Sequence, residues 1–133
     1  MLSAVWFRVL LVALAGACGA LARWGTGYLV QSSLGRTWPL GTLVVNALGC
    51  IVFGAAMGYI KPEQMQQPGD EVMRLVLLTG FCGAYTTYST FAFDVYELWI
   101  SRGPWWAVGN IAAQLIAGLT AIVLGVAMGR AVG

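Results

Sequence analysis

Side chains that could bind a small ion are concentrated in one short stretch of an otherwise apolar chain. Residues 80–91 read GFCGAYTTYSTF, so two glycines, at positions 80 and 83, precede a run of hydroxyl and aromatic side chains. Hydroxyl groups donate hydrogen bonds, and the edges of aromatic rings are electropositive. These groups suit a small anion that exchanges its water shell for donors. They include no carboxylate that a proton-coupled cation exporter could titrate.

Amide side chains extend this set of donors. Asn46 follows Thr42 by one helical turn. Asn110 and Gln114 are four residues apart, so they would share one face of a helix. The alternative interpretation is that such amides only join neighbouring helices by hydrogen bonds; amides and hydroxyls together favour a polar track. Asp94, beyond the hydroxyl run, is expected to face the aqueous end or to pair with a basic residue, because an acid inside a membrane is costly.

The composition places these donors in a membrane. Of 133 residues, 59% are hydrophobic and 9% are charged, whereas a soluble domain is about 25% charged. So few charges cannot cover a water-facing surface, which excludes a soluble enzyme. A net charge of +2 spread along the chain argues against nucleic acid as a partner, and the absence of histidine removes the commonest general base. The three cysteines lie far apart in apolar sequence and are interpreted as packing residues: Cys18, Cys50 and Cys82.

Four apolar segments are long enough to cross a bilayer, which requires about 20 helical residues. We place them at 3–30, 39–60, 72–99 and 104–131, in a single domain covering residues 1–133. Arg8, near the start of the first segment, can extend toward the membrane interface. Residues 15–18 approach a lipoprotein cleavage box, but the apolar sequence continues past Arg23, so we expect this segment to be retained. The expected fold is an all-α membrane protein with four transmembrane helices per chain.

The third segment is expected to be broken near the midplane of the membrane. Its glycines and consecutive hydroxyl residues disfavour a regular helix. Backbone released from helical hydrogen bonds is tolerated at that depth only inside protein or around a cavity, and broken helices in transporters coordinate ions there. The alternative is a continuous helix in which serine and threonine hydroxyls bond to the preceding turn.

The basic residues do not fix one orientation in the membrane. Four spans would place four basic residues on one side and three on the other: Arg8, Lys61, Arg74 and Arg130 against Arg23, Arg36 and Arg102. Because orientation follows Lys and Arg asymmetry, this small difference is compatible with insertion in both directions, or with one direction set by a single charge or by the long first segment. Insertion in both directions would permit an antiparallel homodimer. Small residues four apart, at 16/20, 54/58 and 125/129, would allow close helix packing between chains or within one chain.

Three stretches resemble the signature sequences of the Fluc (CrcB-type) fluoride channels. They are Leu21-Ala22-Arg23 after a segment rich in glycine and alanine, residues 41–49 (GTLVVNALG), and residues 80–91. The similarity extends over nearly the whole chain, and its most specific part is TTYSTF at 86–91. The resemblance implies an antiparallel, dual-topology homodimer in the lipid bilayer of the bacterial inner membrane. It also implies two fluoride pores and a structural Na⁺ on the two-fold axis.

The resemblance assigns expected roles to individual residues. The pore residues would be Arg23, Asn46, Tyr88, Ser89, Thr90, Phe91, Asn110 and Gln114. The backbone carbonyls of Gly83 and Thr86 from both chains would hold Na⁺. The chain departs from the family pattern at three pore positions: Tyr88 replaces a usual phenylalanine, Asn110 a common tyrosine and Gln114 a common serine. These changes keep hydrogen-bond donors but alter the shape of the pore.

The expected function is passive, fluoride-selective export, which needs no enzymatic chemistry. Neutral HF crosses lipid from acidic surroundings and dissociates inside, and a negative-inside potential then drives the anion out through a channel. One alternative is a small multidrug-resistance-type antiporter, which needs a membrane-embedded carboxylate, yet no acidic residue precedes Glu63. A second alternative is a helper subunit of a larger membrane complex, for which the hydroxyl run has no evident purpose.

Overall fold

The computed structural model describes residues 2–35, 37–60 and 68–133, and every regular element within these ranges is helical. The elements are α1 (Leu2–Leu34), α2 (Leu40–Tyr59), α3 (Pro68–Arg74), the π-helical η2 (Leu75–Cys82), α4 (Gly83–Tyr85), α5 (Tyr88–Arg102) and α6 (Pro104–Val132). Three of them, α1, α2 and α6, are long and apolar enough to cross a membrane. The third expected segment is the succession from α3 to α5, which is interrupted between α4 and α5. The all-helical fold is confirmed, and a helix break is present within residues 80–91.

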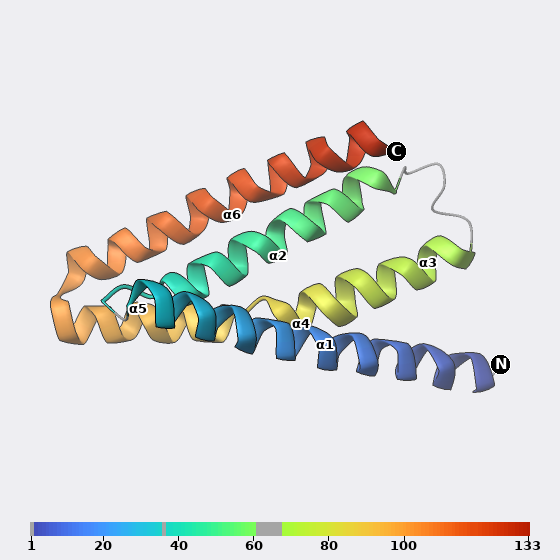
Figure 1. Cartoon of the computed structure of the whole chain (residues 1–133), viewed down its shortest axis with the longest axis horizontal. Coiled ribbons are helices and arrows are strands. Elements are labelled where there is room, and N and C mark those ends of the chain that lie inside the picture. The colour runs from blue at the N-terminus through green and yellow to red at the C-terminus, as the bar shows by residue number, and fades with distance from the viewer. Residues whose placement is uncertain (1, 36, 61–67) are drawn as a thin grey trace.

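The helical segments pack as two pairs, which Figure 1 shows side by side. Helix α2 runs along α6, and α1 runs along the α3–η2–α4 succession. Gly103 joins α5 to α6 with a φ of 97°, a left-handed conformation that suits glycine, and Pro104 then begins α6. The start of α1, the end of α2, the start of α3 and the end of α6 lie at the same end of the bundle (Figure 1).

Glycines allow α2 and α6 to approach closely. A Cβ added at Gly125 would overlap the Ile51 carbonyl, and one at Gly54 would lie 2.5 Å from a carbonyl oxygen of α6. Side chains at Gly58 and Gly129 would meet the facing backbone in the same way. The small residues at 54/58 and 125/129 therefore serve packing within the chain, so they give no independent support for a dimer.

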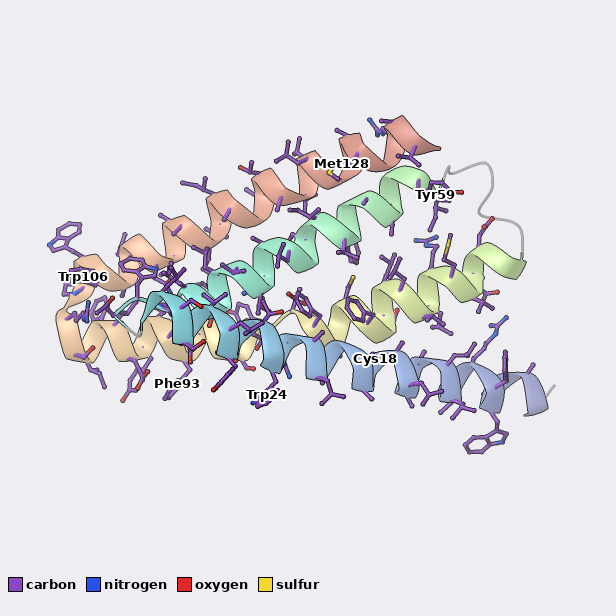
Figure 2. All side chains as sticks on the ribbon, viewed as in Figure 1. Cys18, Trp24, Tyr59, Phe93, Trp106 and Met128 are labelled. Atoms are coloured by element: carbon purple, nitrogen blue, oxygen red, sulfur yellow. The ribbon has the colours of Figure 1, made fainter. Side chains whose placement is uncertain are left out.

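Large apolar side chains cover the outside of the bundle. Trp24 on α1 and Phe93 on α5 project away from the ribbon in Figure 2, and they are 71% and 57% exposed. Near the α5–α6 turn, the rings of Trp38 and Trp106 lie 5.5 Å apart, and the Arg102 guanidinium lies 5.0 Å from the centre of the Trp106 ring. Such a surface suits lipid along the helices, with aromatic and basic side chains at an interface.

An ion pair ties α1 to α3 at the opposite end of the bundle. The Arg8 guanidinium donates to both carboxylate oxygens of Glu71, at 2.8 and 3.0 Å. Both side chains are exposed, so the pair is only weakly stabilising in water. We expected Arg8 to extend toward the membrane interface; the structure shows in addition that it pairs with Glu71.

Candidate ion-binding groove

The helix break is held by an amide side chain of another helix. Thr86 and Thr87 are extended, with ψ of 160° at Thr86 and φ of −149° at Thr87, so the helix stops after Tyr85 and restarts at Tyr88. The Thr87 N–H donates to Asn46 Oδ1 at 2.9 Å, and Asn46 Nδ2 donates back to the Thr87 carbonyl at 3.2 Å. Asn46 thus supplies an acceptor for the Thr87 N–H, which the break releases, and a second donor for the Thr87 carbonyl at the start of α5. Asn46 therefore fixes the position of the break against α2.

The break leaves the backbone carbonyls of residues 83–86 without their usual helical donors, among them those of Gly83 and Thr86. In a regular helix the Thr87 N–H would bond to the Gly83 carbonyl, and the Thr90 N–H would bond to the Thr86 carbonyl. Here Thr87 N–H donates to Asn46 instead, and Thr90 N–H donates to Thr87 Oγ1 at 3.2 Å. The carbonyls of Gly83 and Thr86 therefore lack these two helical donors.

Arg23 lies beside one of these carbonyls. Its Nη1 atom is 3.5 Å from the Thr86 carbonyl oxygen, which is a long contact for a hydrogen bond. A carbonyl oxygen has two lone pairs, so this contact leaves Thr86 able to accept from a second group. The Thr86 hydroxyl is directed elsewhere, since it donates to the Cys82 carbonyl at 2.9 Å.

A groove of about 520 Å³ gathers most of the expected site residues. Its lining includes Asn46, Gly83, Thr86, Tyr88, Phe91 and Gln114. The rings of Tyr88 and Phe91 meet edge to face, with centres 5.8 Å apart and planes at 60°. In a single chain Tyr88 is 80% exposed, so one wall of this groove is still uncovered.

The remaining expected residues lie outside this groove. Arg23, Ser89 and Thr90 line a separate hollow of about 380 Å³, and Thr87 lines both hollows. The Thr87 hydroxyl donates to Thr90 Oγ1 at 2.9 Å and lies 3.3 Å from Ser89 Oγ. Asn110 is 0% exposed, so it lies inside the bundle. The structure thus divides the expected pore residues between two hollows and a buried position.

Buried polar atoms near α6 have no hydrogen-bond partner among the described residues. They are both side-chain polar atoms of Asn110, Nε2 of Gln114, and Oδ2 of Asp94 on α5. Leaving such a group unpaired costs about 1–3 kcal/mol. Gln114 is partly engaged, because its Oε1 accepts from Asn46 Nδ2 at 3.2 Å. The unpaired donors mark where a small polar ligand would be stabilised.

Two features of the site were not assigned from the sequence. A Cβ at Gly49 would overlap the Thr86 side chain, so glycine is required where α2 passes the break. The sequence hint to this role was that Gly49 lies within the signature stretch 41–49. Asp94 on α5 is half-buried, and no ion pair joins it to a basic residue in the part of the chain that the structure describes. Asp94 also lines a polar hollow of about 600 Å³ with Glu97, close to the α5–α6 turn.

Known proteins resemble this chain over most of its length. A family model described as "CrcB-like protein, Camphor Resistance (CrcB)" matches residues 10–126. A "Fluoride-specific ion channel FluC" from Nitratidesulfovibrio vulgaris is 44% identical, with 94% of this chain and 98% of that protein covered. Proteins of the same description from Chloroflexus aurantiacus and Pseudomonas aeruginosa are 36% and 40% identical, covering 92% and 91% of this chain and 95% and 92% of theirs.

Proposed function

The chain belongs to the CrcB family of fluoride-specific ion channels, which are not enzymes, and from this premise we propose that it conducts fluoride passively out of the bacterial cytoplasm. The observation that carries the proposal is the groove at the helix break, which is lined by amide side chains, by the Tyr88 hydroxyl and by the rings of Tyr88 and Phe91. Donors of this kind replace the water shell of a small anion. Passive conduction needs only such a path and the membrane potential.

An antiparallel homodimer in the inner membrane would complete this path. In one chain the groove is uncovered and Tyr88 is largely exposed, so a second copy supplies the missing wall. The near balance of basic residues on the two sides supports insertion in both orientations. The antiporter and helper-subunit alternatives are set aside, because the chain's relatives are described as channels.

A structural Na⁺ at the centre of the dimer is part of the proposal. The carbonyls of Gly83 and Thr86 fit this ion, because their helical donors are engaged elsewhere and both residues line the uncovered groove. Unwound backbone carbonyls are the usual ligands of Na⁺ in membrane proteins with broken helices. Two chains would supply four carbonyls. When bound, Na⁺ would supply the positive charge that offsets the repulsion between them.

Efflux from liposomes tests the proposed function. Purified protein is reconstituted in vesicles loaded with fluoride or with chloride, and a K⁺ ionophore allows charge to be balanced. We expect rapid release of fluoride and little release of chloride, without ATP or a proton gradient. Equal release of both anions would refute selectivity, and absence of fluoride release from correctly inserted protein would refute the channel itself.

A further inference from the structure

Tyr85 carries a hydroxyl group that ties the helix break to α1. Its side chain belongs to the last residue of α4 and is 6% exposed. The hydroxyl donates to Thr26 Oγ1 on α1 at 3.1 Å. A buried tyrosine hydroxyl usually has such a partner, because leaving it unpaired is costly. The two residues are 59 apart in the sequence, so this bond fixes the position of α4 against another helix.

The ring of Tyr85 is enclosed on two further sides. It stacks on the ring of Phe81, with the centres 5.7 Å apart and the planes at 9°. A Cβ added at Gly49 would lie 3.2 Å from Tyr85 Cδ1, so the backbone of α2 passes close to the ring. A ring packed in this way has little room to turn, which keeps its hydroxyl directed at α1.

Helix α1 contacts the break at two consecutive residues. Arg23 precedes Thr26 by about one helical turn, so the two side chains share one face of α1. Arg23 Nη1 lies 3.5 Å from the Thr86 carbonyl oxygen, and Thr26 Oγ1 accepts from Tyr85 at 3.1 Å. The bond to Tyr85 is the shorter of these contacts. Tyr85 therefore provides the closer attachment of the break to α1.

The two carbonyls proposed to bind Na⁺ lie on either side of Tyr85 in the chain. Gly83 begins α4 and Thr86 follows it, and α4 has only three residues, too few for a helix that is stable by itself. The next helix begins at Tyr88. The end of α4 therefore depends on contacts with its neighbours. Because adjacent Cα atoms are held about 3.8 Å apart by a rigid peptide, a shift of Tyr85 displaces the Thr86 carbonyl and, through α4, that of Gly83.

We propose that Tyr85 is a positioning residue for the central cation, and that its hydrogen bond to Thr26 sets the spacing of the Gly83 and Thr86 carbonyls. This inference rests on the proposed structural Na⁺ and adds to it a side chain that does not touch the ion. Carbonyl sites distinguish monovalent cations by the size of the site and the field of its ligands. Without the hydrogen bond the carbonyls can relax, which weakens Na⁺ binding and reduces the preference for Na⁺ over K⁺.

The test is the cation dependence of the dimer fraction in Tyr85→Phe. Phenylalanine keeps the ring and its stacking and removes only the hydroxyl. The dimer fraction is measured as Na⁺ replaces a large organic cation at constant ionic strength, and again with K⁺. We expect the Na⁺ concentration at half-maximal dimer to rise at least about fivefold, about 1 kcal/mol, and the ratio of the K⁺ to the Na⁺ midpoint to fall at least about threefold. Tyr28→Phe, at a 63% exposed position on α1, should keep both wild-type values.

The ratio of midpoints separates positioning from packing. A residue that only stabilises the fold or the dimer would shift the Na⁺ and K⁺ midpoints by the same factor. An unchanged ratio, or an unchanged Na⁺ midpoint, in Tyr85→Phe would therefore overturn the proposal.

Thr26→Val removes the other partner of the same bond and leaves Tyr85 in place, so it provides the test if Tyr85→Phe does not fold. Valine has nearly the shape of threonine, and we expect the same two changes. The double variant should be no worse than either single variant, because both remove one bond, and fully additive effects would contradict the proposal. A wild-type dimer fraction that ignores Na⁺ would overturn the central cation together with this inference, whereas fluoride efflux from liposomes tests the channel separately.

Discussion

Asn46 and Asn110 permit the same substitution in two different hydrogen-bond environments. Asn46 makes three hydrogen bonds, two of them to the backbone of Thr87. Asn110 is 0% exposed and makes none with the described residues. Leucine has the same number and branching of side-chain heavy atoms as asparagine, so Asn46→Leu and Asn110→Leu differ mainly in what they leave unpaired. We expect Asn46→Leu to lower stability by much more than any effect of Asn110→Leu.

The expected magnitudes follow from the groups that each change exposes or removes. Asn46→Leu leaves the N–H of Thr87 and Oε1 of Gln114 unpaired, and both residues are 8% exposed. At about 1–3 kcal/mol for each buried group, the free energy of unfolding should fall by about 2–6 kcal/mol. Asn110→Leu removes two unpaired polar atoms, which is neutral or stabilising when the replacement fits. Slight overpacking offsets part of this gain, so we expect a change of less than about 1 kcal/mol, or a net increase.

Reversible unfolding in mixed micelles measures both values. Six tryptophans provide a fluorescence signal, and the wild type and both variants are compared in the same detergent. A loss below about 1 kcal/mol for Asn46→Leu would show that the break does not depend on this amide. An Asn110→Leu variant that loses as much stability as Asn46→Leu would show that Asn110 is hydrogen bonded after all.

The other predictions concern packing, topology, the pore ring and the cation. Gly125→Val should separate α2 from α6 by placing a side chain against the Ile51 carbonyl, so folded protein should be lost in size-exclusion profiles; a normal profile would contradict the packing. Gly69→Cys, where a new side chain meets nothing within 4 Å, should be labelled by impermeant maleimide from both faces of the inner membrane, and labelling from one face alone would exclude the antiparallel homodimer. Tyr88→Phe should conduct and Tyr88→Ile should lose well over tenfold in flux, about 1.4 kcal/mol for each tenfold, because only the ring edge is needed; near-normal flux through the isoleucine variant would remove Tyr88 from the pore. Replacing Na⁺ by a large organic cation, or introducing Gly83→Val, should reduce the fraction of dimer at equilibrium, and indifference to both would exclude the central cation site.

The helix break could be predicted from the sequence because its cause is local. Glycines followed by threonines at 86 and 87 have poor helix propensity, and the structure ends one helix and begins the next there. The spacing of small residues on α2 and α6 could also be recognised in the sequence. It could not show that these two glycine faces pack against each other within one chain. Periodicity and propensity therefore located the elements.

The partners of the break could not be predicted from local sequence. Asn46 and Thr87 are 41 residues apart, and Asn46 and Gln114 are 68 apart. The residues next to Asn46 and Gln114 in the sequence do not indicate that both N–H groups of the Asn46 amide are hydrogen bonded while Gln114 Nε2 has no partner among the described residues. Such roles emerge from tertiary contacts.

The central claim is passive conduction of fluoride, and the reversal potential of the current tests it most directly. Protein is reconstituted in a planar bilayer with a tenfold gradient of sodium fluoride and equal, high concentrations of an impermeant anion salt. A fluoride-selective channel should give a current that reverses near the fluoride equilibrium potential, about 59 mV for this gradient. Adding chloride to one side should leave the reversal potential unchanged. A reversal potential that follows the proton, Na⁺ or chloride gradient, or the absence of any current, would contradict the account.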